Sequence, residues 1–307
     1  MYDVLVIGAG PAGITAGIYA VRNKLNAIVL EKNYIGGGQI LNTLQIDNYP
    51  ALPNISGIQL AKDMRHHAET LGVVFKTAEV TGIADNGNSK IVQTVSEDFE
   101  TKTVLIATGT SHRMLNVPGE TAFLGKGVSY CATCDGVFFK EKTVAVIGGG
   151  NAAVQYAIFL ARICPKVHLV HRRDTLRADR ALQEQLLSLS TVQIHWNSTV
   201  QAISGTNTVT SIDLADTQTG SLSTLHVQGI FIAAGLVPNT KPFLELVRTN
   251  KEGFIEAAED CKTSCAGIFA AGDVRTKPMR QIVTALSDGA TAIASIEQYM
   301  LAISGNK

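Results

Sequence analysis

Short apolar runs rich in β-branched residues recur along the chain and predict buried strands. A continuous apolar run of about 4–8 residues is typical of a parallel strand that is buried on both faces. Runs of this kind are YDVLVI (2–7), AIVLE (27–31), TVLIATG (103–109), TVAVI (143–147), KVHLV (166–170) and GIFAAGDV (267–274). Helical spacing follows the runs at 2–7 and 143–147, the first helix extending from Ala12 to about Arg22. This alternation predicts an α/β fold.

Weaker signals fill the rest of the chain. The segment DNGN (85–88) carries turn residues between two alternating stretches and predicts a hairpin turn. A long helix is expected from about residue 281 to 301. Further short strands are expected over residues 192–204, 208–213 and 229–235.

The length of the chain predicts two domains. Its 307 residues exceed the ~250–300 residues at which a single core stops growing. GLVPNTK (235–241) is interpreted as a linker. In the simplest topology the first domain, formed by residues 1–111 and 239–307, is interrupted by an inserted second domain, residues 112–238.

Composition excludes several classes of partner. Lys plus Arg and Asp plus Glu both total 26, so nothing favours a nucleic acid or a membrane surface. The apolar runs are shorter than the roughly 20 residues that a membrane span needs. The N-terminus begins with a strand pattern and lacks a signal-peptide pattern. We therefore expect a cytoplasmic protein.

The first apolar run leads into GAGPAG, in which Gly8, Gly10 and Gly13 have G-x-G-x-x-G spacing. In a strand–turn–helix unit, the first glycine allows the tight turn and the second lets backbone N–H groups approach a pyrophosphate. The third lets the helix pack on the strand. A strand follows that ends at Glu31, where an acid can bind a ribose hydroxyl. These features predict a dinucleotide site.

The same arrangement recurs in the middle of the chain. GGGNAA carries Gly148, Gly150 and Ala153 as G-x-G-x-x-A, between a strand and a helix. An acid at the end of the next strand would favour a free ribose 2′-OH, whereas arginines favour a 2′-phosphate. At that point the chain reads HRRD, which supplies His171, Arg172, Arg173 and Asp174, and Arg177 follows.

The second site is therefore predicted to bind NADP(H). Asp174 is placed to cap a helix that begins near Thr175. Two dinucleotide sites with different preferences suggest two cofactors, and the economical assignment is a tightly held flavin in the first site and NADPH in the second.

Cys131 and Cys134 form a C-x-x-C pair that has three interpretations. A zinc site would need Cys261 and Cys265 as further ligands, but these lie in the other expected domain. A permanent disulfide would close a very small loop and add little stability. A redox pair is favoured, because in C-x-x-C the first thiol can have a lowered pKa and its neighbour can resolve a mixed disulfide.

The remaining candidates have no assigned chemistry. Cys164, Cys261 and Cys265 are expected to be small buried or surface residues, and no metal site is expected. His66 and His67 lie in a helical stretch without a metal-spaced partner, so we expect them on its solvated face.

Several motifs together resemble the low-molecular-weight bacterial thioredoxin reductases over essentially the whole chain. They are GAGPAG, ATG (107–109), CATCDG (131–136), the second glycine motif with HRRD, and GIFAAGDVR ending at Arg275. The resemblance implies two Rossmann-like domains of three ββα layers, the second inserted in the first. It also implies a homodimer that moves electrons from NADPH through FAD and a disulfide to thioredoxin or a similar small dithiol protein, while the two domains rotate between two arrangements.

The resemblance assigns roles to individual residues. Cys134 would lie against the flavin, Cys131 would attack the thioredoxin disulfide, and Asp135 would protonate the departing thiolate. The implied FAD contacts are Gly8, Gly10, Pro11, Ala12, Gly13, Glu31, Lys32, Gly38, Gln39, Asn48, Ala107, Thr108, Gly109, Gly272, Asp273, Arg280, Gln281 and Ile282. The implied NADPH contacts are Gly148, Gly150, Asn151, Ala152, Ala153, His171, Arg172, Arg173 and Arg177.

The second glycine motif departs from the family pattern. It reads GGGNAAVQYA where GGGDSAVEEA is usual, so Asn151 replaces an acid and Gln155-Tyr156 replaces an acidic pair. Two alternatives stay open: a related flavoenzyme that uses another electron donor or acceptor, such as ferredoxin, and a non-catalytic flavin redox sensor. The cysteine pair counts against the first alternative and the arginines count against the second.

Overall fold

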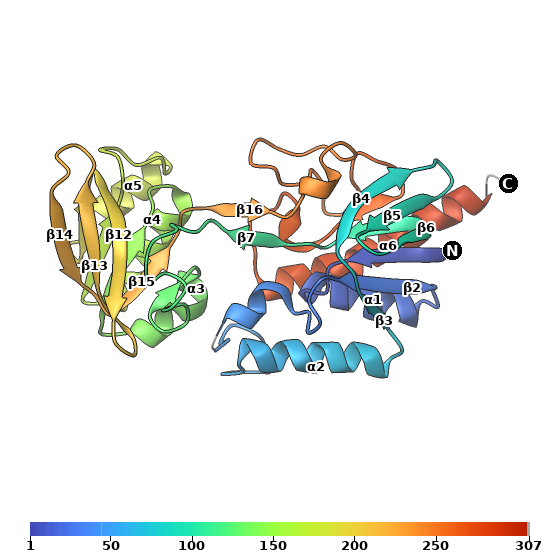
Figure 1. Cartoon of the computed structure of the whole chain (residues 1–307), viewed down its shortest axis with the longest axis horizontal. Helices are drawn as coiled ribbons and strands as arrows, with labels where there is room; N and C mark the ends of the chain where they lie inside the picture. The colour runs from blue at the N-terminus through green and yellow to red at the C-terminus, as the bar shows by residue number, and fades with distance from the viewer. Residues whose placement is uncertain (44, 306–307) are drawn as a thin grey trace. The chain divides into compact units, whose positions relative to one another are not determined.

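The computed structural model describes residues 1–43 and 45–305 and divides into two compact units (Figure 1). Unit 1 comprises Met1–Leu41, Tyr49–Ser111 and the chain from Val237 onward, and unit 2 comprises Asn42–Asn48 and His112–Leu236. The connecting strands β7 (Thr110–His112) and β16 (Leu236–Pro238) pair with each other. Among the described helices, none combines the length and hydropathy that a membrane span requires.

Unit 1 is built on a seven-stranded sheet in the order β3-β2-β1-β6-β5-β4, with β17 paired to β6. Strands β1, β2, β3, β6 and β17 run parallel, and β4 and β5 add an antiparallel hairpin. The strands are β1 (Tyr2–Ile7), β2 (Ala27–Glu31), β3 (Val74–Thr77), β4 (Val80–Asp85), β5 (Lys90–Thr94), β6 (Asp98–Ile106) and β17 (Ile268–Ala270). The helices are α1 (Pro11–Arg22), α2 (Gly57–Thr70) and α6 (Ile282–Gly305), with 3-10 turns η1 (Gly38–Asn42), η3 (Lys241–Phe243) and η4 (Gly272–Val274).

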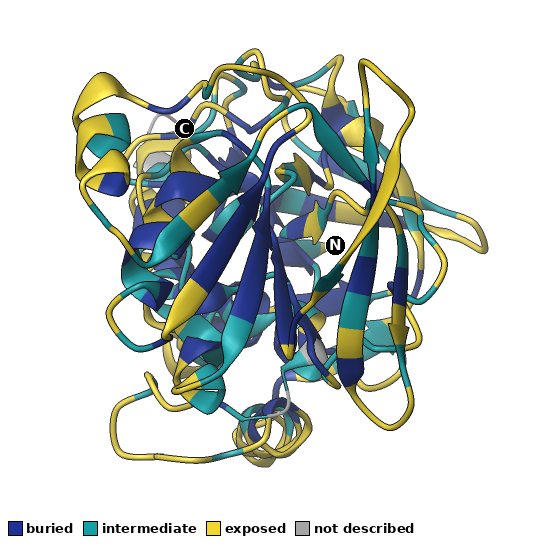
Figure 2. Cartoon of the chain, turned by 90° about the vertical axis from the view of Figure 1, so that its left-hand side faces the viewer, coloured by how far each residue is buried: buried dark blue, intermediate teal, exposed yellow. Residues whose placement is uncertain are grey.

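Strand β1 supplies two cores on opposite faces of this sheet. Val4 and Val6 pack with residues of α1 and α6, whereas Leu5 and Ile7 pack with residues of β5 and η3. All four side chains are almost fully buried, which explains why the strand is apolar throughout. In Figure 2 the dark blue segments lie mainly in strands and helices, whereas the connecting loops are largely yellow.

Unit 2 has three layers. A parallel sheet in the order β11-β10-β9-β15-β8 is covered by helices on one face and by the antiparallel sheet β12-β13-β14 on the other. The strands are β8 (Val128–Ser129), β9 (Thr143–Ile147), β10 (Lys166–Val170), β11 (Val192–His195), β12 (Ser198–Gly205), β13 (Val209–Asp216), β14 (Leu222–His226) and β15 (Gly229–Ile232). The helices are α3 (Ala132–Asp135), α4 (Asn151–Leu160) and α5 (Arg180–Leu187), with the 3-10 turn η2 (Gly136–Phe139).

The predicted α/β fold is confirmed, and most elements lie where the sequence predicts them. The first helix begins at Pro11, and the long C-terminal helix begins at Ile282. The hairpin turn at 85–88 is present, and the side chain of Asp85 accepts a hydrogen bond of 2.8 Å from the Gly87 amide.

Several boundaries were wrong. Residues 192–204 form two strands rather than one, because the chain turns between β11 and β12. The strand expected over 267–274 ends at Ala270 and gives way to η4, where Gly272 has a φ of +77°. Strand β14 had no sequence signal, since four of its five residues are exposed and carry no apolar alternation.

The helix expected near Thr175 does not exist, so Asp174 caps nothing. Helix α5 begins at Arg180, with Asp179 as its N-cap residue. The preceding loop is held by two contacts with the second glycine turn and the end of β10. The Arg177 amide donates to Gly149 O (2.7 Å), and His171 Nε2 donates to Thr175 O (3.0 Å).

A buried ion cluster ties η4 to helix α6. The Asp288 carboxylate accepts hydrogen bonds from Arg275 (2.9 Å from both Nε and Nη2), from Lys277 Nζ (2.8 Å) and from the Gly272 amide (2.8 Å). The three charged side chains are 7% exposed or less. Burial raises the pKa of Asp288, but the hydrogen bonds from Arg275 and Lys277 outweigh it and hold the pKa below the ordinary value of 3.8.

Replacing Asp288→Asn should lower the free energy of unfolding of unit 1 by about 3–5 kcal/mol, because two buried cations lose their partner. Chemical denaturation followed by circular dichroism measures the change. Asp260→Asn is the matched control, since Asp260 and Lys262 form an exposed ion pair that contributes little.

This difference in the free energy of unfolding should depend on pH. Because the pKa of Asp288 is depressed in the folded protein, its contribution is present above pH 3.8 and is lost as the pH falls through the folded pKa. The stability difference between wild type and Asp288→Asn should therefore shrink in strong acid. A difference that stays constant from neutral pH into strong acid would contradict this assignment.

Candidate active site

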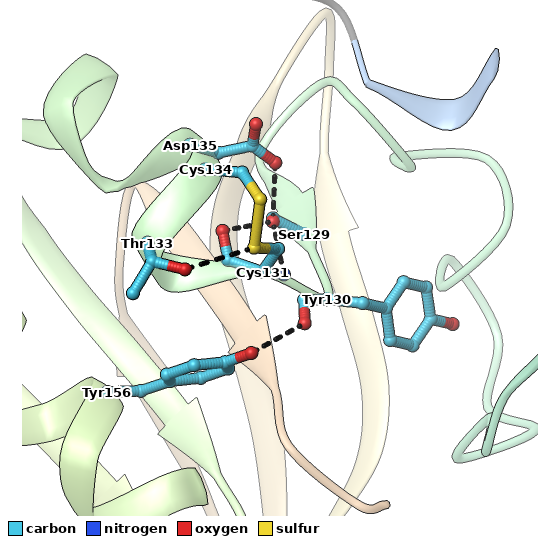
Figure 3. Close-up of a disulfide and its surroundings, with 7 residues drawn as sticks. All are labelled: Ser129, Tyr130, Cys131, Thr133, Cys134, Asp135 and Tyr156. Carbon is cyan, nitrogen blue, oxygen red and sulfur yellow. Dashed lines mark hydrogen bonds between the residues drawn. A yellow bond between two sulfur atoms is a disulfide. The ribbon is translucent and has the colours of Figure 1, made fainter. Parts of the chain in front are cut away.

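The predicted C-x-x-C pair forms a disulfide, with the two Cα atoms 5.3 Å apart (Figure 3). Cys131 is the N-cap residue of α3, and its carbonyl oxygen accepts hydrogen bonds from the amides of Cys134 (3.3 Å) and Asp135 (3.1 Å). Both cysteines are half-buried, while Thr133 between them is exposed. The disulfide therefore lies in a tight, hydrogen-bonded turn near the surface of unit 2.

Ser129 joins Asp135 to the start of this turn. Its hydroxyl donates to Asp135 Oδ2 at 2.6 Å and accepts from the Cys131 amide at 3.0 Å (Figure 3). Burial raises the pKa of Asp135, and the hydrogen bond from Ser129 offsets part of that rise. A carboxyl group with a raised pKa beside a disulfide is suited to deliver a proton.

Tyr130, which precedes the disulfide, anchors the turn on its other side. Its ring stacks on His112 with centroids 4.5 Å apart, and its hydroxyl donates to Glu120 at 2.7 Å. Glu120 is 1% exposed and also accepts from the amides of Leu115 and Asn116. Burial lowers the pKa of His112 to about 4, so the stacked imidazole is neutral near pH 7.

Sequence reasoning gave Ser129, Tyr130 and Glu120 no role. Their side-chain hydrogen bonds join residues 2 to 10 positions apart, and no periodic pattern encodes such contacts. Only their proximity to the C-x-x-C pair could have drawn attention to them.

The first glycine turn has the geometry that its motif predicts. Gly8 has a φ of +105°, and a Cβ atom there would lie 2.5 Å from Ala107 O. A Cβ atom on Gly13 would clash with Gly8 O, whereas Gly10 faces open space with only Gly38 about 4.0 Å away. The open side of the turn therefore lies at Gly10, where backbone can approach a ligand.

Glu31 lies beside this turn, as the spacing suggests. Its carboxylate accepts from the Ala9 amide (2.8 Å) and the Asn33 amide (3.0 Å). Gln39 is fixed by Thr110, since its Nε2 donates to Thr110 O at 2.9 Å. Pro11 and Ala12 begin helix α1. Lys32 is exposed, and its predicted contact with a cofactor stays a prediction.

Asp273 carries a buried oxygen that needs a donor. Among the residues described, its Oδ1 has no hydrogen-bond partner, and burial raises its pKa although Lys277 and Arg280 lower it in part. An unsatisfied buried polar atom costs about 1–3 kcal/mol. A ligand hydroxyl would remove that cost, so this site fits the ribityl hydroxyls of a flavin.

The other residues that were predicted to contact FAD fall into two groups. Some lie near this turn, and the structure does not place the others in a site. Arg280 donates to Asp273 O (3.3 Å) and to Arg275 O (3.2 Å), which braces η4. Ala107 lies against Gly8. The remaining contacts expected from the sequence, which stay predictions, are Asn48, Thr108, Gly109, Gln281 and Ile282. Asn48 is exposed and is grouped with unit 2.

The second glycine turn reproduces the first. A Cβ atom on Gly148 would lie 2.6 Å from Ala233 O, and nothing lies within 4 Å of the corresponding position at Gly150. Ala153, the third position of the motif, is fully buried. The ring of His171 lies against Gly149, where a Cβ atom would clash with it.

Three arginines follow β10 close to His171, whose ring lies against the second turn. Arg172, Arg173 and Arg177 are exposed, and within residues 1–43 and 45–305 none of them forms an ion pair. Burial lowers the pKa of His171, and all three arginines contribute to lowering it further. They therefore form one positive cluster that is free to bind an anion.

Asn151, which departs from the family pattern, has a defined partner. Its side chain donates to Asp179 Oδ2 and accepts from the Asp179 amide, both at 2.8 Å. Ala152 follows it as an exposed residue in the first turn of α4. The substitution therefore links the starts of α4 and α5, a contact that the sequence did not suggest.

The remaining cysteines and histidines are separate from these sites. Cys164 and Cys261 are buried, and burial raises the pKa of their thiols to about 11 and about 12. His66 and His67 are exposed on α2. Over the described part of the chain, no cluster of three or more metal-ligating side chains is found.

Comparisons with known proteins agree with this geometry. The family model for pyridine nucleotide-disulphide oxidoreductases matches residues 2–289. A thioredoxin reductase of Bacillus subtilis (strain 168) is 42% identical over 98% of this chain and 95% of the relative. That of Listeria innocua is 43% identical over 98% of this chain and 94% of the relative.

Solved structures give the same result. The thioredoxin reductase of Streptococcus pyogenes MGAS5005 has a TM-score of 0.93 at 42% identity, covering 98% of this chain and 99% of that one. The Lactococcus lactis thioredoxin reductase in its FR conformation has a TM-score of 0.69 at 40% identity, covering 98% and 100%. The family predicted from the motifs is thus confirmed, and the chain belongs to the low-molecular-weight thioredoxin reductases of the pyridine nucleotide-disulphide oxidoreductase family.

Proposed function

We propose that the chain is an NADPH-dependent FAD enzyme that reduces the disulfide of thioredoxin or of a similar small dithiol protein. The observation that carries the proposal is the Cys131–Cys134 disulfide beside Asp135. This redox pair lies in the same unit as a dinucleotide turn and a cluster of unpaired arginines.

The two units take different cofactors in this proposal. FAD is held by residues 1–111 and 239–307, through the first glycine turn, Glu31 and the unsatisfied oxygen of Asp273. NADPH is held by residues 112–238, where the arginine cluster binds the 2′-phosphate and Gly150 leaves room for the pyrophosphate. Bound FAD would supply the two-electron chemistry that connects NADPH oxidation to reduction of the disulfide.

The side chains then carry out a disulfide exchange. With the pair reduced, the Cys131 thiolate attacks one sulfur of the substrate disulfide, and the substrate S–S bond breaks. Asp135 gives its proton to the departing substrate thiolate. The Cys134 thiolate then attacks Cys131, which restores the intramolecular disulfide and releases the reduced substrate. Two electrons leave the enzyme in each cycle.

The proposed function also implies an electron acceptor and a homodimer. Thioredoxin or a related dithiol protein is the acceptor, and two copies of the chain form a homodimer in a cytoplasmic compartment that keeps thiols reduced. The arginine cluster supports NADPH over a ferredoxin-linked donor, because a protein donor needs no 2′-phosphate site.

Cys134→Ser should abolish NADPH-dependent thioredoxin reduction, because no second thiol is left to resolve the mixed disulfide. Oxidation of NADPH by an artificial acceptor should remain, since that reaction needs only the flavin. Both activities are measured from NADPH absorbance, and Cys265→Ser is the control outside the pair. Thioredoxin reduction that survives in Cys134→Ser would contradict the proposed mechanism.

Arg172→Gln and Arg177→Gln should each raise the KM for NADPH about 10- to 100-fold, because a charge-assisted hydrogen bond contributes about 1.5–3 kcal/mol. The KM for NADH should change little. Arg180→Gln is the control, since Arg180 is exposed but pairs with Glu184. Equal effects on both nucleotides would remove the 2′-phosphate assignment.

Asp273→Ala should weaken FAD binding about tenfold, because a hydrogen-bond acceptor is lost. Asp273→Asn, which keeps an acceptor oxygen, should retain more flavin. The flavin-free form of Asp273→Ala should melt at a higher temperature than flavin-free wild type, since a buried unsatisfied oxygen is removed. The absorbance ratio of flavin to protein and thermal unfolding of the flavin-free forms check this. Unchanged flavin content would contradict the role of Asp273.

A further inference from the structure

Ser129 occupies a central position among the groups that surround the disulfide. It ends strand β8 and is 5% exposed. Its Oγ lies 2.6 Å from Asp135 Oδ2, 3.0 Å from the Cys131 amide nitrogen and 3.3 Å from the Cys131 carbonyl oxygen. One hydroxyl thus reaches both the residue proposed to attack and the residue proposed to supply the proton.

The single hydroxyl hydrogen goes to Asp135. The contact with the Asp135 carboxyl group is the shorter of the two possible donations, and this hydrogen bond strengthens when that group becomes ionised. The lone pairs of Oγ remain available to accept from the Cys131 amide. Ser129 therefore links the backbone of Cys131 to one defined oxygen of Asp135.

No other described residue provides this link. Tyr156 on α4 feels the charge of Asp135, which raises the pKa of its phenol beyond the rise that burial causes. The Tyr156 hydroxyl donates to Tyr130 O (3.3 Å) rather than to Asp135. Within the described residues the Asp135 carboxyl group forms no ion pair. The Ser129 hydroxyl donates a hydrogen bond to it.

We propose that Ser129 is a positioning residue for disulfide exchange, because its hydroxyl orients the Asp135 carboxyl group relative to Cys131 and stabilises the carboxylate that proton delivery leaves behind. The inference rests on the proposed function. When the Cys131 thiolate breaks the substrate disulfide, the electron pair leaves with the second sulfur, and the proton moves from Asp135 to that sulfur. The negative charge then develops on Asp135, where the Ser129 hydroxyl already donates.

The first test compares Ser129→Ala with Ser129→Thr. The enzyme is reduced with dithionite, and its re-oxidation by thioredoxin disulfide is followed by stopped flow. Ser129→Ala should slow this step about tenfold, a fraction of the roughly 10²–10⁴-fold that a general acid contributes. Ser129→Thr should restore most of the rate, because it keeps the hydroxyl and a cavity of about 30 Å³ borders Ser129 and Asp135.

A double-mutant cycle separates positioning from a general loosening of the turn. In an Asp135→Asn background, Ser129→Ala should have almost no further effect, because the two residues act together. If Ser129→Ala slows the reaction equally in both backgrounds, the hydroxyl acts only on the turn and the inference is overturned.

An infrared titration tests the link without any acceptor protein. The carbonyl band of protonated Asp135 is assigned by its absence in Asp135→Asn, and its midpoint is measured against pH. Ser129→Ala should move the midpoint to higher pH, because a hydrogen bond that favours the carboxylate is lost. Tyr156→Phe removes a hydrogen bond from the same turn without touching Asp135, so it should keep the wild-type midpoint.

These readouts distinguish the inference from the proposed function. A wild-type protein that never reduces thioredoxin, although Ser129→Ala still shifts the infrared midpoint, would contradict the function while leaving the Ser129–Asp135 link intact. A wild-type protein that reduces thioredoxin, together with an unshifted midpoint in Ser129→Ala, would overturn the inference alone.

Discussion

Both units depend on a strand-to-helix turn in which the backbone passes too close to a neighbouring strand end for a side chain to fit. A Cβ atom would lie 2.5 Å from Ala107 O at Gly8 and 2.6 Å from Ala233 O at Gly148. The close approach brings the helix start to the carboxyl end of the sheet, where its free N–H groups can bind phosphate. The two proposed nucleotide sites therefore share one packing constraint that occurs twice.

In each unit, buried polar groups fix the residues of one proposed site. Burying such groups would destabilise the fold if they were not hydrogen-bonded. In unit 1 the Asp288 cluster fixes η4, and η4 holds the oxygen of Asp273 that has no protein partner among the described residues. In unit 2 Ser129 holds Asp135 beside the disulfide. An unsatisfied group that is held rigidly is typical of a site whose ligand completes its hydrogen bonds.

Sequence patterns predicted the features that depend on local spacing. The buried strands, the glycine turns and the C-x-x-C pair depend on residue type and periodicity, so they were visible in the sequence. The loop at 174–179 was not, since the contact from Arg177 to Gly149 O competes with helix formation. The partnership of Asn151 with Asp179 and that of Ser129 with Asp135 depend on side chains that meet only after folding.

In the proposed function, flavin and disulfide form one electron path that NADPH supplies. An anaerobic titration with NADPH, following flavin absorbance and counting the equivalents consumed per flavin, tests this most directly. We expect an uptake of about two equivalents, one for the flavin and one for the Cys131–Cys134 disulfide. An uptake of about one equivalent, or flavin reduction by dithionite but not by NADPH, would contradict it.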